Sequence, residues 1–162
     1  MIPQPVFQSP PLYKCIQASP APVTVYEGLY AADPFAFLYE SLEGDGTRGR
    51  YSFVGGRPRL VFQSKGPQIT LETRGERFNL EGDPLEFLRR LVGPPIDCPA
   101  VVPFPGGAVG YLGYDIVRFC EKLPDDKPDD LRMPDSYFLF PEEIIAFESD
   151  RFHELWTRTM QP

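Results

Sequence analysis

The chain has 162 residues, a length that suits one domain and allows a hydrophobic core without disulfide or metal cross-links. Apolar residues make up 42% of the sequence and aromatic residues 14%, which excludes a chain that is disordered throughout. The formal net charge of −7 argues against nucleic acid or an anionic membrane as the main partner, because both bind basic surfaces.

No run of the sequence approaches the roughly 18 apolar residues of a membrane span, and the first residues have no features of a signal peptide. The three cysteines, Cys15, Cys98 and Cys120, are odd in number and irregularly spaced, so they predict neither a disulfide framework nor a metal site. We therefore expect a cytoplasmic protein.

Residues 1–20 are predicted to be an extended N-terminal segment. The β-branched and aromatic run at 23–30 then predicts a first strand. Asp33 and Pro34 resemble the start of a helix, with apolar residues at helical spacing behind them and Gly44 at its end. This helix would place Glu40 near its last turn.

A second helix is predicted from Asp83 to Gly93. Asp83 would cap its N-terminus, Pro84 would occupy the first turn, and Glu86 would complete a capping box. Gly93 follows the last apolar residue of the stripe and would end the helix. A shorter helix is expected within 115–123, with Cys120 on its inner side.

The remaining elements are predicted as strands, several of them joined as hairpins, such as the pair around the turn at 73–76. Hairpins with few parallel crossovers favour the α+β class, with an antiparallel sheet and a few short helices outside it. We treat 1–162 as one domain. The predicted strands are 50–55, 59–64, 68–73, 77–80, 106–113, 137–140, 144–148 and 153–159.

Three features resemble sites of chemistry but do not support one. His153 is the only histidine and has no nucleophile motif beside it. The glycines of 106–113 lack the spacing of a dinucleotide-binding loop, and the acidic run 125–130 lacks the turn glycine of a calcium loop. We predict no catalytic and no metal-binding residue, and an exposed loop at 125–130.

The stretch 37–56 crowds polar side chains between apolar ones. Glu40 could bind an ammonium group, Arg50 could bind a carboxylate, and the hydroxyls of Ser41 and Ser52 lie nearby in sequence. Alternation along the strand puts Tyr51 on the opposite side from Arg50 and Ser52. Residues alone leave two interpretations open: a receptor for an amino acid, or a corner in which Glu40 and Arg50 pair.

Longer motifs favour the first interpretation. The sequence LYES stands at 38–41, GRYSFVG at 49–55 and GGAVGYLGYD at 106–115. Together they resemble the N-terminal region of anthranilate synthase component I and of its relative, the large subunit of aminodeoxychorismate synthase. The resemblance spans about residues 20–150, and it implies half of a sandwich of antiparallel sheets with helices outside.

Enzymes of this family convert chorismate, using ammonia from a glutamine amidotransferase partner. The resemblance implies that their chorismate-binding and Mg²⁺-binding residues lie in a C-terminal domain beyond the region matched here. It therefore implies no cofactor in this chain and no catalysis by this chain alone. The expected partners are that C-terminal domain, the amidotransferase subunit and L-tryptophan as effector.

Carried over by motif, Glu40 and Ser41 match the Glu-Ser of the family's tryptophan-binding motif, and Arg50, Tyr51 and Ser52 match a second wall of the same pocket. Tyr39 departs from the family's usual leucine. Feedback control of anthranilate synthesis is the function that the resemblance implies. The alternatives are the corresponding domain of aminodeoxychorismate synthase and a stand-alone amino-acid-binding module.

Overall fold

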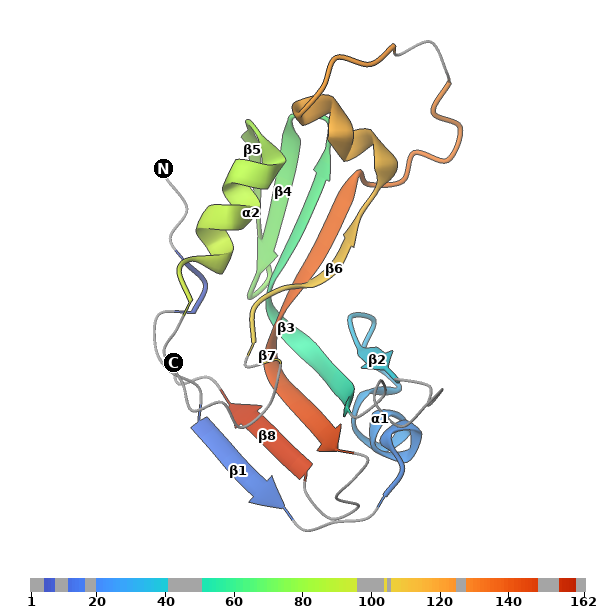
Figure 1. Cartoon of the computed structure of the whole chain (residues 1–162), viewed down its shortest axis with the longest axis vertical. Helices are drawn as coiled ribbons and strands as arrows, with labels where there is room; N and C mark the ends of the chain where they lie inside the picture. The colour runs from blue at the N-terminus through green and yellow to red at the C-terminus, as the bar shows by residue number, and fades with distance from the viewer. Residues whose placement is uncertain are drawn as a thin grey trace. The chain divides into compact units, whose positions relative to one another are not determined.

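The computed structural model describes residues 5–7, 12–16, 20–40, 51–95, 104, 106–124, 128–148 and 155–159. The described residues form strands, two α-helices and one 3-10 helix (Figure 1). In chain order these are β1 Leu12–Ile16, α1 Pro22–Tyr30, β2 Phe37–Tyr39, β3 Tyr51–Lys65, β4 Gln68–Thr73, β5 Glu76–Glu81, α2 Pro84–Val92, β6 Val109–Leu112, η1 Tyr114–Phe119, β7 Ser136–Glu148 and β8 Leu155–Thr159.

The strands form one sheet in the order β1-β8-β7-β3-β4-β5, with β2 added to β3 and β6 added to β7. The pairings of β1 with β8, β2 with β3, β4 with β3 and β5, and β7 with β6 and β8 are antiparallel. This architecture confirms the predicted α+β class. None of the helices in the described part of the chain is long and apolar enough to cross a membrane.

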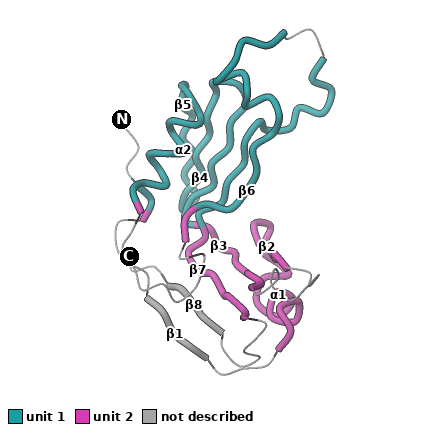
Figure 2. The backbone as a smooth tube through the Cα atoms, in the orientation of Figure 1, with its two compact units in different colours: residues 1–6, 59–94, 108–140 teal, residues 7–58, 95–107, 141–162 magenta. Residues whose placement is uncertain are grey.

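The chain divides into two compact units (Figure 2). Unit 1 comprises residues 1–6, 59–94 and 108–140, and unit 2 comprises residues 7–58, 95–107 and 141–162. Strands β3 and β7 contribute residues to both units.

The core of unit 1 contains apolar side chains from β3, β4, β6, β7 and α2. They include Phe62, Ile69, Leu91, Val109 and Phe140, all of them buried. Burial of each such side chain stabilises the fold by about 1.5–3 kcal/mol.

Helix α2 confirms the second predicted helix. The side chain of Asp83 accepts hydrogen bonds from the backbone N–H groups of Leu85 (2.8 Å) and Glu86 (3.3 Å), which caps the helix. Gly93, with φ of 73°, ends it and donates to the carbonyl of Arg89. The predicted turn between β4 and β5 is also present, with positive φ at Arg74 and Gly75.

In unit 2, α1 packs against the sheet. Tyr30 is buried together with Val54 of β3 and Ile145 of β7. Val25 and Tyr26 of α1 also pack against this cluster, so the buried side of the helix follows a spacing of about four residues.

The prediction of a strand at 23–30 is therefore wrong, because this segment is helix α1. The β-branched residues suggested a strand, but burial of one helical face on the sheet outweighs that local preference. Pro22 at the first helical position was the overlooked signal.

The prediction of a helix after Asp33 is also wrong over its described residues, which form a turn and then β2. Asp33 does not cap a helix. Its Oδ1 accepts from the N–H of Phe35 (2.9 Å) and its Oδ2 accepts from the N–H of Arg57 in β3 (2.6 Å). Gly56 permits this approach, because a Cβ there would lie 2.6 Å from Asp33 Oδ2.

Two pairs of predicted strands are single long strands. Residues 51–55 of the first predicted strand and the segment 59–64 both belong to β3, and 137–140 and 144–148 both belong to β7. The sequence suggested a break at Gly56–Pro58, where β3 instead continues through Arg57 at a φ of 48°. β1 lies within the N-terminal segment and was not predicted.

The segment 106–113 contains β6, and 115–123 overlaps η1. Cys120 is exposed at the end of η1, so its predicted inward orientation is wrong. Strand β8 confirms the last predicted strand from residue 155 onward. His153, Cys98, Gly44 and residues 125–127 of the acidic run lie outside the described residues; the described remainder of that run, 128–130, is exposed as predicted.

Candidate functional site

The candidate effector site lies where β2 ends and β3 begins, in unit 2. Tyr39 is the last paired residue of β2 and lies opposite Phe53 of β3. Glu40 follows directly and is exposed. One further step of the same register would place Glu40 opposite Ser52, and cross-strand partners share a face of a sheet.

This face is the one that carries the core of unit 2. Leu38 lies opposite Val54, and both belong to the cluster that packs against α1. Residues two apart in a strand point to the same face, so Ser52 follows Val54 on this side. Glu40 and Ser52 are therefore expected on the same face of the sheet as the apolar side chains of Leu38 and Val54.

Tyr51 points to the opposite face. Its ring stacks with that of Phe53 at a centroid distance of 6.3 Å, and Phe53 in turn contacts the edge of Phe104 (5.8 Å). The Tyr51 hydroxyl donates a hydrogen bond to Glu148 Oε1 of β7 (3.1 Å). This agrees with the alternation predicted along the strand and separates Tyr51 from Glu40 and Ser52.

Glu148 was missed by the sequence analysis. Its carboxylate is buried, with 8% of the residue exposed, and it fixes the orientation of Tyr51. It lies 97 residues from Tyr51 in the chain, and no local motif connects the two. Its position near the end of a predicted strand was the only available signal.

Ser41 and Arg50, the remaining predicted site residues, lie outside the described residues. The surroundings of the site differ from the prediction, because Glu40 follows a strand instead of ending a helix. The site is thus a connection between two antiparallel strands, with Glu40 at one end and Tyr51 at the other.

A second polar group lies beside this corner in unit 2. The buried Tyr30 donates its hydroxyl hydrogen to Glu143 Oε2 (2.9 Å), and the guanidinium of Arg57 lies over the Tyr30 ring at 5.4 Å from its centroid. Burial, followed by the hydrogen bond to Glu143, raises the pKa of the Tyr30 phenol. Tyr30 therefore stays protonated at neutral pH and has a structural role.

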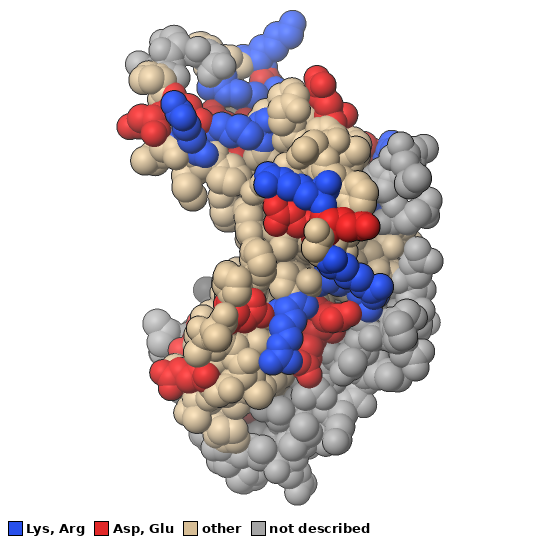
Figure 3. All heavy atoms as spheres, turned by 180° about the vertical axis from the view of Figure 1, so that it is seen from behind, with Lys and Arg blue, Asp and Glu red and all other residues tan. Residues whose placement is uncertain are grey.

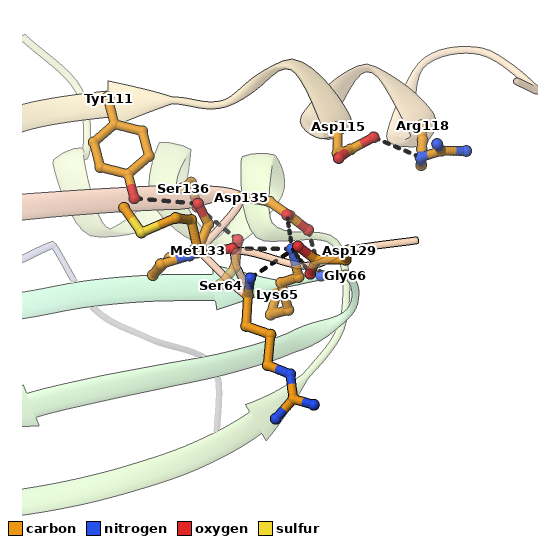
Figure 4. Close-up of polar contacts among 12 residues, drawn as sticks. Ser64, Lys65, Gly66, Tyr111, Asp115, Arg118, Asp129, Met133, Asp135 and Ser136 are labelled. Atoms are coloured by element: carbon orange, nitrogen blue, oxygen red, sulfur yellow. Dashed lines mark hydrogen bonds and ion pairs between the residues drawn. The ribbon is translucent and has the colours of Figure 1, made fainter. Parts of the chain in front are cut away.

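Unit 1 contains its own polar cluster at the turn between β3 and β4 (Figure 4). Lys65 Nζ contacts Asp129 Oδ2 (2.7 Å), Asp135 Oδ1 (2.8 Å) and the carbonyl of Met133 (2.9 Å). Asp135 Oδ2 also accepts from the N–H of Gly66 (2.7 Å).

These contacts join the loop before β7 to the turn after β3. Next along the chain to Lys65 and Asp135, the buried hydroxyls of Ser64 and Ser136 hydrogen-bond to each other (2.6 Å). The hydrogen bond to Asp129 is the largest cause of a raised Lys65 pKa, and the same bond lowers the pKa of Asp129. Lys65 thus pairs with both Asp129 and Asp135, so the cluster is a structural link and not a binding site for a metal cation.

Among the described residues, no three histidine, cysteine, aspartate or glutamate side chains gather so that they could hold a metal ion. On the face shown in Figure 3, lysine and arginine lie beside aspartate and glutamate. Over the described residues of that face there is no extended basic patch of the kind that binds nucleic acid.

The chain is thus an α+β protein whose candidate small-molecule site lies between β2 and β3. Among its described residues there is no metal-binding cluster. No protein-family model matches the chain. Curated proteins do match. The chain is 43% identical to anthranilate synthase component 1 from Thermus thermophilus over 128 residues, which is 78% of this chain and 27% of that protein.

It is also 38% identical to anthranilate synthase component 1 from Acetivibrio thermocellus over 69% of this chain and 23% of that protein. For the protein from Cereibacter sphaeroides the identity is 40%, over 78% of this chain and 27% of the relative. The crystal structure of anthranilate synthase component I from Streptococcus pneumoniae has the same fold, with a TM-score of 0.56 at 21% identity, covering 92% of this chain and 31% of that one.

The chain is therefore related to anthranilate synthase component 1, as its motifs indicate. It spans about a quarter of the length of these relatives.

Proposed function

We propose that the chain is the N-terminal part of an anthranilate synthase component 1 and serves tryptophan biosynthesis. The 43% identity to the Thermus thermophilus relative carries this proposal. Anthranilate synthesis from chorismate then belongs to the longer protein, whose C-terminal part would bind chorismate and Mg²⁺. An amidotransferase subunit would supply the ammonia. This chain alone would not catalyse the reaction.

We further propose that the corner between β2 and β3 binds tryptophan as a feedback effector. Glu40, Ser41, Arg50 and Ser52 are the proposed binding residues, whereas Tyr51, which the sequence motif also suggested, points to the opposite face and would support the strand through its hydrogen bond to Glu148. Glu40 would accept the ammonium group and Arg50 would bind the carboxylate, because these are the charge-assisted contacts that a free amino acid requires. The apolar surface that ends in Leu38 and Val54 would lie beside the side chain of the effector.

Inhibition at this corner requires tryptophan to bind one arrangement of the enzyme more tightly than another. A ligand with equal affinity for the active and inactive arrangements would change nothing. The proposed coupling is between occupation of the corner and the packing of this part of the protein against the catalytic part.

The experiment is to replace Ser41 by alanine in the full-length enzyme and to measure anthranilate formation at increasing tryptophan concentration. Loss of a hydrogen bond to a charged group costs about 1.5–3 kcal/mol, so the concentration for half-inhibition should rise by about ten-fold or more. Turnover without tryptophan should stay close to that of the unaltered enzyme.

Thr70→Ala is the matched control, because it removes a hydroxyl from β4 of unit 1, whereas the corner belongs to unit 2. Its inhibition curve should not move. If Ser41→Ala leaves inhibition unchanged, the corner is not the effector site. If the full-length enzyme forms no fluorescent anthranilate but an intermediate that needs a further lyase, aminodeoxychorismate synthase is the correct enzyme.

A further inference from the structure

Strand β6 is an open edge of the sheet in unit 1. Among the described strands it pairs with β7 alone (Figure 1). Its residues Tyr111 and Leu112 are 40% and 50% exposed, and Tyr114 directly after it is 85% exposed. Exposed edges of this kind are templates for pairing with another strand.

The opposite edge of the sheet in unit 1 is different. Strand β5 carries the charged residues Glu76, Arg77 and Glu81, and charged side chains block association of edge strands. Strand β6 has the sequence VGYL, without a charge or a proline. Strand β5 therefore has charged residues that protect an edge strand from pairing with another chain, and β6 has none.

The backbone of β6 has hydrogen-bonding groups that point away from β7. Gly113 donates to the carbonyl of Asp135 (2.7 Å), one step beyond the paired residues Leu112 and Ser136. In an antiparallel pair, hydrogen-bonded and non-hydrogen-bonded positions alternate. The N–H and C=O groups of Leu112 and Gly110 therefore point toward the open edge.

The sequence around Tyr111 is complementary to itself. If two copies of this strand run antiparallel with Tyr111 opposite Tyr111, a small residue meets a larger one at each neighbouring position. The facing pairs are Gly110 with Leu112 and Gly113 with Val109. At Gly110 only glycine fits, because a Cβ would overlap the carbonyl oxygen of Tyr137 and lie 2.7 Å from Phe138 Cα.

We propose that β6 pairs with β6 of a second copy of this chain across a two-fold axis at Tyr111. In this arrangement Leu112 of each copy exchanges its backbone hydrogen bonds with Gly110 of the other. The two Tyr111 rings, each stacked on its own Tyr137 at 6.3 Å, lie side by side on one face.

Charge favours this place for self-association. A chain of net charge −7 repels its own copies over most of its surface, so an uncharged edge is the surface that two copies can share. The nearest acidic residue along the chain, Asp115, is paired with Arg118 (2.9 Å). Because a four-residue edge buries little area, the dimer is expected to be weak.

The test is sedimentation of the 162-residue chain over a wide range of concentration, with Leu112→Pro and Leu112→Ala compared. Proline removes the outward N–H of residue 112 but none of the bonds to β7, whereas alanine keeps that N–H. Since this N–H is lost from both copies, two hydrogen bonds of the dimer are removed, and the dimer should weaken at least about ten-fold more in Leu112→Pro than in Leu112→Ala.

A second pair of variants compares the two edges. Tyr111→Lys would set like charges opposite each other across the axis and should abolish the dimer. Phe78→Lys changes a residue of similar exposure, 46%, on β5 and should leave it intact. Far-ultraviolet circular dichroism checks that each variant is folded. A chain that stays monomeric throughout, or a dimer that Phe78→Lys abolishes and Tyr111→Lys does not, would overturn the proposal.

Discussion

The carboxylate of Asp33 joins two parts of unit 2. One oxygen accepts from the backbone of Phe35 in the turn after α1, and the other accepts from the backbone of Arg57 in β3. The turn that leads into β2 is therefore tied to the neighbouring long strand. Since Glu40 lies at the end of β2, this contact also bears on the position of the proposed effector site.

We expect Asp33→Ala to lower the free energy of unfolding by about 1–2 kcal/mol, because two backbone N–H groups lose a charged acceptor at a partly exposed site. Urea denaturation followed by circular dichroism measures this change. Asp33→Asn keeps one acceptor oxygen and should lose less. Equal losses in the two variants would show that the hydrogen bonds do not account for the effect.

At the scale of the element, helix α2 was predicted correctly and helix α1 was missed. The signals for α2, its Asp83 cap and its Gly93 terminus, lie within the segment itself. For α1 the local signal was Pro22 alone, against several β-branched residues, and the helical face is defined by distant contacts with Val54 and Ile145. The error after Asp33 has the same origin, since its carboxylate serves a strand 24 residues away.

The same distinction applies to the candidate site. The alternation that separates Tyr51 from Ser52 could be predicted, because it follows from strand geometry. That Glu40 and Ser52 share a binding site stays a prediction. The buried partner Glu148 could not be found, because it approaches Tyr51 only through the packing of β7 beside β3. Motifs thus indicate candidate residues for a site, while tertiary contacts decide their orientation.

Helix α2 also contains an ion-pair group with a defined pH dependence. Glu86 contacts Arg89 (2.9 Å) and Arg90 (2.7 Å), and the hydrogen bond from Arg89 is the largest cause of a Glu86 pKa lowered from 4.5 to about 2. A carboxylate whose pKa is lower in the folded state contributes stability above its ordinary pKa. That contribution is lost as pH falls from about 4.5 toward 2.

We therefore expect Glu86→Gln to be less stable than the unaltered chain near neutral pH and to differ less from it as the solution is acidified through this range. The urea midpoint measured as a function of pH follows this convergence. Glu81→Gln, an exposed glutamate of β5, is the control. Parallel curves for Glu86→Gln and the unaltered chain would contradict the assignment.

At the scale of the whole molecule, the chain spans about a quarter of the related enzymes, so the proposed effector corner would hold only part of the pocket. A large aromatic side chain buries about 150–250 Å² at roughly 25 cal/mol per Å². If a second wall comes from the remaining part of the enzyme, much of this burial is missing in the isolated chain.

We accordingly expect isothermal titration calorimetry of the 162-residue chain with L-tryptophan to show weak or undetectable binding. The full-length enzyme under the same conditions is the comparison, and it should bind measurably. Micromolar affinity of the isolated chain would show that the corner is complete without the rest of the protein.

Trp156 is the only tryptophan of the chain and lies in β8 opposite Ala146 of β7, within unit 2. Unit 1 has none, and its aromatic residues are tyrosine and phenylalanine. Excitation at the red edge of protein absorption would therefore follow the melting of unit 2 alone, while amide signals follow both units. A chain that melts in a single cooperative step would give one transition by both probes, and separate melting of the units would give two.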